Sequence, residues 1–282
     1  MADPTEFEER EDLSEAERHL MVQGSRLKAA LVHEVIRHEG EEELQRTVSA
    51  LAWSGLAAGL SMGFSLVVEG LLRHHLPDAP WRPLVESFGY TTGFVIVVLG
   101  RQQLFTESTL TAVIPALTRR DRETLLALLR LWVVVLLANL VGAGLFAALA
   151  FGVPVFEPNL HRDFLAIGQE AAAGSFVVLF VKAVLAGWLI ALMVWLLPGA
   201  ASARLIIIVL ITYIVAVGGF AHVIAGSVEV LYLVLAGAKS LPSYLIDYLV
   251  PVLAGNIVGG SALVAMLNHA QVRHEVPAAT EA

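Results

Sequence analysis

The chain lacks cysteine altogether and is poor in charged residues. None of its 282 residues is cysteine, and only 16% are Asp, Glu, Lys or Arg. The missing thiols exclude structural disulfides and cysteine-ligated metal sites. Soluble domains carry about 25% charged residues, so the low charge excludes an ordinary globular enzyme, a disordered chain and a coiled coil.

Apolar residues dominate instead. They make up 57% of the chain, and the mean hydropathy is +0.72. Apolar stretches of about 18 residues or more recur along the sequence and are long enough to cross a bilayer as helices. The composition therefore predicts an integral membrane protein.

The acidic residues are concentrated at the N-terminus. Residues 1–46 hold 13 of the 26 acidic side chains but only 6 of the 18 basic ones, so the net charge of −8 says nothing of a nucleic-acid partner. No apolar segment with a small-residue cleavage site opens the chain, so we expect no cleaved signal peptide. Helical apolar spacing from Ser14 to Leu44 predicts a cytoplasmic amphipathic helix against the membrane domain or the headgroups. A gate or a partner-docking element is the alternative.

Six apolar spans follow this extension, and polar residues interrupt two of them. The second span is interrupted at residues 100–108 and the fifth at residues 218–222. Non-helical backbone at that depth must be buried in protein or line a cavity, because lipid offers it no hydrogen-bond partner. The expected spans are Thr47–Leu72, Phe88–Leu117, Leu125–Phe151, Ala171–Leu197, Leu205–Gly237 and Tyr244–Asn268.

The distribution of basic residues sets the orientation. Placing both termini in the cytoplasm puts 11 Lys and Arg residues on the inner side and 4 on the outer side. This excess on the inner side is the pattern that membrane proteins follow. We therefore expect a multi-pass protein of the plasma membrane, such as a bacterial inner membrane, with a cytoplasmic tail at residues 269–282.

An internal repeat links the two interrupted spans. Asn139 in span three and Asn256 in span six each lie among small residues, 117 positions apart, and small residues suit close helix packing. Thr106 and His222, one in each interrupted span, are 116 positions apart. The spacing predicts an all-α membrane domain, residues 47–268, with an inverted 3+3 repeat and two re-entrant spans that meet near the midplane.

At this point the sequence resembles the formate–nitrite transporter family, in a divergent, YfdC-like subgroup. The resemblance covers about residues 48–267 and implies an aquaporin-like protomer in a homopentamer. Each protomer would have its own pore for small monovalent anions such as formate or nitrite. It places Thr106 on the first re-entrant loop and His222 at the pore centre. The matching segments are Leu104-Phe105-Thr106, Phe180-Val181-Lys182, Gly219-Phe220-Ala221-His222 and residues 249–260.

The resemblance also implies two hydrophobic constrictions around the central histidine. Phe220 is the clearest candidate, and Phe94, Phe105 and Leu104 are further ones; such constrictions exclude ions by dewetting. The chain departs from the family in having Gln103 before Leu-Phe-Thr, Gly187 in span four, and no Glu, Ser or Asn around the histidine. These departures bear on which substrate is transported more than on the fold.

His222 and Thr106 are the leading pathway residues. A histidine inside a membrane span is costly and usually faces a cavity or a partner. Charged, His222 would attract an anion or pass it a proton; neutral, it would still donate one hydrogen bond. A buried histidine bonded to a backbone carbonyl is the alternative. The Thr106 hydroxyl either orients His222, coordinates the passing ion, or only packs.

Lys182, Arg101 and Glu107 are charged residues within the spans, and each has a functional or a structural interpretation. Lys182 raises the local anion concentration, or it pairs with Glu69 or Glu229 or snorkels to the interface. Arg101 is an extra anion-attracting group or, as we favour, forms a bridge to Glu107 in the same loop, since neither charge is stable alone in the membrane.

The sequence as a whole predicts a channel or transporter for small weak-acid anions. Its partners are the bilayer, small anions and protons, and further copies of itself. A pore for another small or neutral solute is one rival, and a non-conducting membrane scaffold or sensor is another. No catalytic, cofactor or metal motif is found, so we expect no enzyme and no cofactor. We interpret His74, His75, His269 and His274 as surface residues.

Overall fold

The protein is described from a computed structural model, in which residues 29–200 and 202–272 are placed. Every regular element within these residues is helical. The elements are α3 (Ala29–Gln45), α4 (Val48–His75), α5 (Arg82–Leu99), α6 (Phe105–Thr111), α7 (Val113–Arg119), α8 (Arg122–Gly152), α9 (Pro158–Ala171), α10 (Phe176–Leu196), η1 (Leu197–Gly199), α11 (Arg204–Val217), α12 (Val223–Leu235), α13 (Leu241–Ser243), η2 (Tyr244–Leu249), α14 (Val250–Ile257), η3 (Val258–Ala265) and α15 (Met266–Val272).

Four helical rods in the described residues are long and apolar enough to cross a membrane. Two shorter apolar helices, α11 and α12, together cover the fifth expected span. The last rod is continuous from α13 to α15 and contains two π-helical stretches, η2 and η3. The four rods are Val48–His75, Arg122–Gly152, Phe176–Gly199 and Leu241–Val272.

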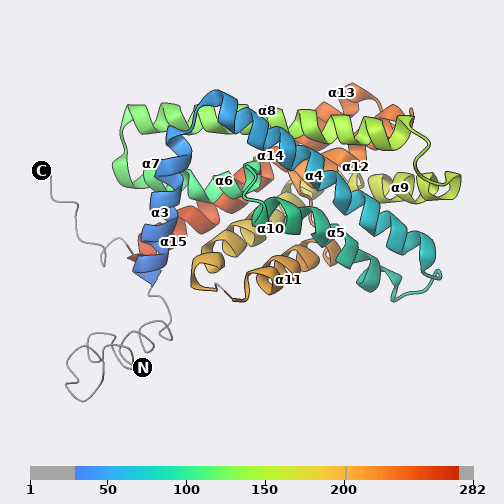
Figure 1. The fold of residues 1–282 in the computed structure, drawn as a ribbon, viewed down its shortest axis with the longest axis horizontal. Helices are drawn as coiled ribbons and strands as arrows, with labels where there is room; N and C mark the ends of the chain where they lie inside the picture. The colour runs from blue at the N-terminus through green and yellow to red at the C-terminus, as the bar shows by residue number, and fades with distance from the viewer. Residues whose placement is uncertain (1–28, 201, 273–282) are drawn as a thin grey trace, which may run out of the picture.

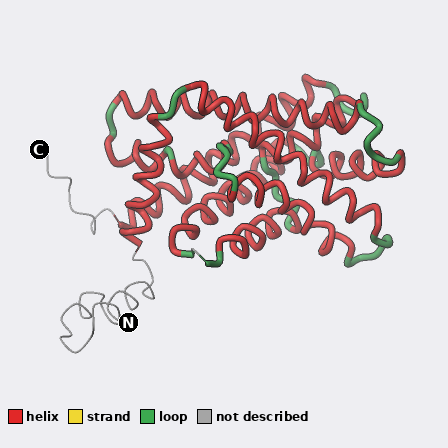
Figure 2. The backbone as a smooth tube through the Cα atoms, in the orientation of Figure 1, coloured by secondary structure: helices red, strands yellow, loops and turns green. Residues whose placement is uncertain are grey.

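The two interrupted spans are broken inside the bundle, as the polar residues predicted. After α5 the chain is non-helical over residues 100–104 and then enters α6. After α11 it is non-helical over residues 218–222 and then enters α12. Figure 2 shows short loop segments of this kind lying among the helices.

Glycines let the long rods approach closely in two matching pairs. Helix α4 packs on α8, where a Cβ added at Gly59 would lie 2.2 Å from the Asn139 carbonyl oxygen. Helix α10 packs on α14, where a Cβ at Gly187 would lie 2.4 Å from the Asn256 carbonyl oxygen. Small residues at such contacts are typical of membrane helix packing. They bring both asparagines into the core, where each is fully buried.

Helix α9 is an element that the span pattern did not reveal. Pro158 opens it in the first turn, and Leu160, Phe164 and Ile167 form its buried face against α12 and α4. The fourth span was expected to begin at Ala171. Because α9 occupies those residues, α10 begins only at Phe176, after Ser175 caps it.

Helix α3 packs across one end of the bundle, beside α7 and α15, while α9 lies at the opposite end (Figure 1). Its buried stripe is Val32, Ile36, Gly40 and Leu44. A Cβ at Gly40 would lie 2.0 Å from the Thr111 carbonyl oxygen, so α3 touches the bundle backbone directly. The helix was expected from Ser14; residues 14–28 lie outside the described residues.

A pair of histidines joins the first and last described helices. His33 Nε2 lies 3.0 Å from His269 Nδ1, so His269, expected as a surface residue, is half-buried and has a partner on α3. Burial and the neighbouring His269 lower the pKa of His33. The docked state therefore favours the uncharged ring.

We predict that acid loosens the docking of α3. A histidine whose pKa is lowered in the docked state loses stabilisation as the pH falls below about 6.5, the value of the free side chain. Burial raises the pKa of Glu43 on the same helix. The effect of Glu43 on the docking of α3 is therefore opposite to that of His33, since it stabilises the docked state as the pH falls. Amide hydrogen exchange of α3, corrected for intrinsic rates, should rise between about pH 7.5 and pH 5.5.

The matched control is His33→Gln, which keeps a hydrogen-bonding group without a titrating ring. In that variant the acid-induced rise in exchange should disappear. An equal rise in both proteins would show that the histidine pair is not responsible.

Candidate functional site

Both helix interruptions have the same local structure. At the end of α5, Gln102 N donates to Val97 O at 3.0 Å and Arg101 has φ 50°. At the end of α11, Phe220 N donates to Val215 O at 2.9 Å and Gly219 has φ 59°. This is the left-handed helix ending in which glycine is preferred. The two endings are copies of one motif, and Arg101 occupies the position that glycine fills in the second copy.

The helices that follow the breaks also begin in the same way. Leu104 and His222 are the N-cap residues of α6 and α12, with extended backbone at φ −103° and −109°. Leu104 is therefore the counterpart of His222. The prediction that paired Thr106 with His222 across the repeat is wrong by two residues, because the sequence offset was taken from side chains of similar polarity rather than from the backbone.

Each break is fixed by one buried asparagine. Asn139 Oδ1 accepts from Phe105 N at 2.9 Å, and its Nδ2 donates to Gln103 O at 2.9 Å and to Gly55 O at 2.7 Å. The amide thereby satisfies backbone groups that a broken helix leaves unpaired.

The second asparagine repeats this arrangement. Asn256 Oδ1 accepts from Val223 N at 2.8 Å, and its Nδ2 donates to Ala221 O at 3.0 Å and to Ala183 O at 2.8 Å. The two breaks are thus held by equivalent hydrogen bonds, the first from Asn139 on α8 and the second from Asn256 on α14.

His222 and Thr106 meet between the two breaks. His222 Nε2 lies 2.7 Å from Thr106 Oγ1, and both residues are buried, with exposures of 1% and 0%. The Phe94 ring stands nearly perpendicular to the imidazole, with the centroids 4.9 Å apart. The contact closes the space between the two helix N-termini with one hydrogen bond.

The backbone around His222 assigns its tautomer. His222 Nδ1 accepts from Ile224 N at 3.3 Å and from Ala225 N at 3.2 Å, as a cap at the start of α12. An accepting nitrogen carries no proton, so the proton of the neutral ring lies on Nε2 and is donated to Thr106. Protonating Nδ1 would break the cap and place a cation at the positive end of the helix. The geometry favours a neutral hydrogen-bond donor over a proton relay.

Of the four residues expected to form constrictions, three are buried in the protein and one, Phe220, lines a cavity. Phe94, Leu104 and Phe105 are all 1% exposed or less. Phe94 contacts His222, whereas Phe105 packs its ring against Trp132. Phe220 is half-buried and lines a cavity whose wall also includes His222.

Two cavities are lined by residues of the two breaks. The α3-side cavity has a volume of about 400 Å³ and is lined by the first break with parts of α3 and α11. The α9-side cavity has a volume of about 110 Å³ and is lined by the second break, including His222, with parts of α9 and α12. His222 lies on the wall of the α9-side cavity, and Gln103 and Glu107, on either side of Thr106 in the chain, line the α3-side cavity, while Thr106 itself is fully buried.

The charged residues do not pair as the sequence suggested. Lys182 forms no ion pair with Glu69 or Glu229; its Nζ lies beside the second break, 3.8 Å from where a Cβ on Gly219 would be. Arg101 forms no bridge to Glu107. Arg101 is exposed and lines the α3-side cavity, whereas Glu107 Oε1 is buried without a hydrogen-bond partner among the described residues.

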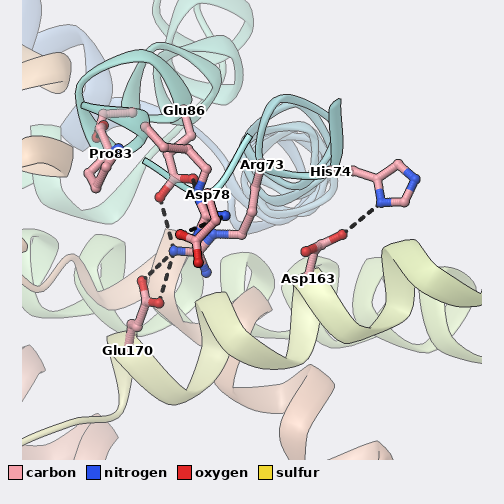
Figure 3. A network of polar contacts seen from close by, with 9 residues as sticks. Arg73, His74, Asp78, Pro83, Glu86, Asp163 and Glu170 are labelled. Carbon is pink, nitrogen blue, oxygen red and sulfur yellow. Dashed lines mark hydrogen bonds and ion pairs between the residues drawn. The ribbon is translucent and has the colours of Figure 1, made fainter. Parts of the chain in front are cut away.

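An ion-pair network near α9 was missed from the sequence. Arg73 donates to Glu86 at 2.9 and 3.1 Å and to Glu170 at 2.8 and 2.9 Å, as Figure 3 shows. Beside it, His74 lies 3.0 Å from Asp163, so His74 has a partner as well. The signal was present: a charged residue within a membrane span marks a partner or a cavity. No group of side chains in the described residues could hold a metal ion.

Comparison with known proteins gives consistent matches. The family model described as Formate/nitrite transporter matches residues 30–270. The chain is 43% identical over 250 residues to the inner membrane protein YfdC of Escherichia coli, covering 88% of this chain and 80% of that protein. It is 25% identical over 240 residues to the formate channel FocA of Haemophilus influenzae, covering 76% and 83%.

Solved structures share the fold. A pentameric formate channel with formate bound is similar with a TM-score of 0.66 at 22% identity, covering 85% of this chain and 99% of that chain. A second structure, described as an FNT family ion channel, has a TM-score of 0.62 at 21% identity, covering 88% and 97%. The all-helical chain has the fold of these channels.

We predict that Arg101→Gly stabilises the protein. A non-glycine residue in the left-handed region costs about 1 kcal/mol, and glycine removes that strain. Thermal unfolding in detergent should show a higher Tm for Arg101→Gly. Arg101→Ala keeps the Cβ and removes the same charge, so its Tm should stay near that of the unaltered chain. An equal shift of the Tm in both variants would contradict the backbone strain assigned to Arg101.

Proposed function

Because the chain belongs to the formate/nitrite transporter family, we propose that it forms a multi-pass pore for small monovalent weak-acid anions, such as formate and nitrite, or for their conjugate acids. The observation that carries the proposal is the His222–Thr106 contact between two cavities. The cargo passes from one cavity to the other by displacing this contact. No catalytic step is needed.

The proposed architecture has six spans in an inverted 3+3 repeat. Four full-length rods and two broken spans make up the six, and each half has one break fixed by one asparagine. The breaks enter from opposite membrane faces and meet at His222 and Thr106, as in an aquaporin-like protomer. The matched helix endings at Arg101 and Gly219 support this repeat.

The protein is proposed to lie in a bacterial inner membrane as a homopentamer with both termini cytoplasmic. The similarity to an inner membrane protein of Escherichia coli and the excess of basic residues on one side support this location and orientation. The similarity in fold to a pentameric formate channel supports five copies, each with its own pore. Helix α8 offers an apolar surface for lipid or for neighbouring copies, with Leu129, Val133, Leu137 and Val141 all exposed.

In the proposed mechanism His222 acts as an uncharged donor. An arriving anion or acid accepts the Nε2 hydrogen in place of Thr106 Oγ1, so the ring is never left without a partner. Lys182, half-buried beside Gly219, concentrates anions at the α9-side cavity. Phe94, Leu104, Phe105 and Phe220 keep the passage narrow and dry, which excludes hydrated ions.

We predict that His222→Asn lowers formate and nitrite flux by about tenfold or more. Asn still caps α12, but its shorter side chain no longer reaches Thr106, and a lost buried donor is worth about 1–3 kcal/mol. Flux is measured in proteoliposomes by stopped flow. Thr106→Ser keeps the hydroxyl and should stay near the unaltered rate.

Glycerol is included to separate the anion pore from a pore for neutral solutes. Formate and nitrite should pass at least tenfold faster than glycerol. Equal permeation by glycerol and formate would contradict the proposed cargo, and an unchanged rate in His222→Asn would contradict the role of the histidine.

A further inference from the structure

Two acidic side chains on the wall of the α9-side cavity form no ion pair with any of the described residues. Glu229 on α12 is 5% exposed, and no hydrogen bond or ion pair reaches its carboxyl group from the described residues. Glu69 on α4 lines the same cavity, and its Oε2 is buried without a hydrogen-bond partner within the described part of the chain. Both lie on the wall that also holds His222.

The basic residues nearby are already engaged or form no ion pair with the two acids. Arg73 binds Glu86 and Glu170 with short hydrogen bonds (Figure 3). Arg82 lies 3.4 Å from Glu86 and from Asp78. Lys182 on α10 lies beside Gly219 and pairs with neither acid. The other titratable groups facing the cavity are the carboxylate of Glu170, which Arg73 binds, the hydroxyls of Tyr90 and Tyr248 and the neutral ring of His222, with Tyr244 behind Tyr248.

Unpaired carboxylates are unstable in such a place. A lone ionised carboxylate in an apolar interior costs several kcal/mol, so the group keeps its proton instead. Two carboxyl groups that share a cavity of about 110 Å³ repel each other when both are ionised. Burial and mutual repulsion therefore favour a state in which Glu69 and Glu229 together hold at least one proton.

The pathway needs a proton that His222 is not placed to give. An anion that enters the dry contact keeps its charge unless it takes up a proton first, and the neutral acid is far easier to desolvate. His222 Nδ1 is held as an acceptor by Ile224 N and Ala225 N, and its one proton is on Nε2. A donor upstream of the contact, on the wall of the α9-side cavity, removes this difficulty.

We propose that Glu229, sharing a proton with Glu69, protonates the weak-acid anion in the α9-side cavity before it reaches His222. The O–H bond of the Glu229 carboxyl breaks and an O–H bond forms on the anion, which leaves as the neutral acid. The Glu229 carboxylate is then reprotonated by a hydronium ion from the solution at the mouth of the cavity, which leaves a water molecule. The inference rests on the proposed function and names the proton donor for it.

The test compares formate uptake at two pH values in proteoliposomes. Glu229→Gln and Glu69→Gln/Glu229→Gln keep the shape of the side chain but have no acidic proton. At about pH 7 both variants should take up formate at least tenfold more slowly than the unaltered protein. At about pH 4.5 their rates should approach the unaltered rate, because free formic acid is then abundant outside and arrives already protonated.

A pH-sensitive dye inside the vesicles gives a second readout. In the unaltered protein formate uptake at about pH 7 should acidify the interior, and the variants should lose this acidification in proportion to uptake. The matched control is Asp163→Asn. It removes a carboxylate of α9 that bonds His74 on α4 and does not line the cavity. Its pH profile should equal that of the unaltered protein.

The outcomes distinguish a failure of the proposed function from a failure of the proton-donor assignment. If the unaltered protein carries no weak acid at any pH, the proposed function fails and this inference with it. If it does, and Glu229→Gln keeps the unaltered rate at about pH 7, the proton donor is wrongly assigned. A loss of equal size at both pH values also overturns the inference, because it indicates a structural defect. If Glu229→Gln yields no folded protein, the single variant Glu69→Gln is judged by the same criteria.

Discussion

Everything in this fold depends on how two broken helices satisfy their backbone inside an apolar bundle. A break exposes N–H and C=O groups that lipid cannot bind and that water cannot reach in a closed core. Asn139 and Asn256 solve this with one side chain each, which bonds two backbone groups of its own break and one carbonyl of the neighbouring rod. The close glycine contacts of α4 with α8 and of α10 with α14 place the two amides at the required depth. Without these bonds the two helix N-termini would not face each other.

His222 combines a structural and a functional position. One ring nitrogen caps α12 and the other bonds Thr106, so the same hydrogen bonds that start the helix also fix the tautomer of the ring. A residue held in this way has its one proton on Nε2, and the positive field of the helix N-terminus also disfavours a charged ring. In the proposed mechanism His222 is therefore a hydrogen-bond donor, and the carboxyl groups on the cavity wall, which lie apart from the cap, transfer the proton.

Part of this arrangement could be predicted from the sequence. The polar residues at 100–108 and 218–222 located both breaks, because polar groups in apolar spans are informative. The Asn139 and Asn256 segments were expected to mark close helix contacts, but their hydrogen bonds to the breaks were not predicted. The family resemblance, confirmed by the family model and the relatives, supplied the fold. The register of the repeat was missed by two residues, since backbone caps rather than side-chain polarity define it, and Leu104 at the cap gives no polar signal. Helix α9 was missed because its short amphipathic pattern lies between the third and fourth expected spans, where no helix was predicted. The partners of Arg73, and the absence of a bridge between Arg101 and Glu107, depend on three-dimensional distances that no local pattern contains.

The central claim is that the α3-side and α9-side cavities open to opposite membrane faces and are separated by the His222–Thr106 contact. The chain has no cysteine, so single cysteines can be placed without background. Gln102→Cys lines the α3-side cavity and Ala216→Cys the α9-side cavity. Labelling with a charged, membrane-impermeant thiol reagent in inverted and right-side-out vesicles is the most direct measurement. The account predicts that Gln102→Cys reacts only from the face that carries the termini and Ala216→Cys only from the other face. Labelling of both from one face would contradict it.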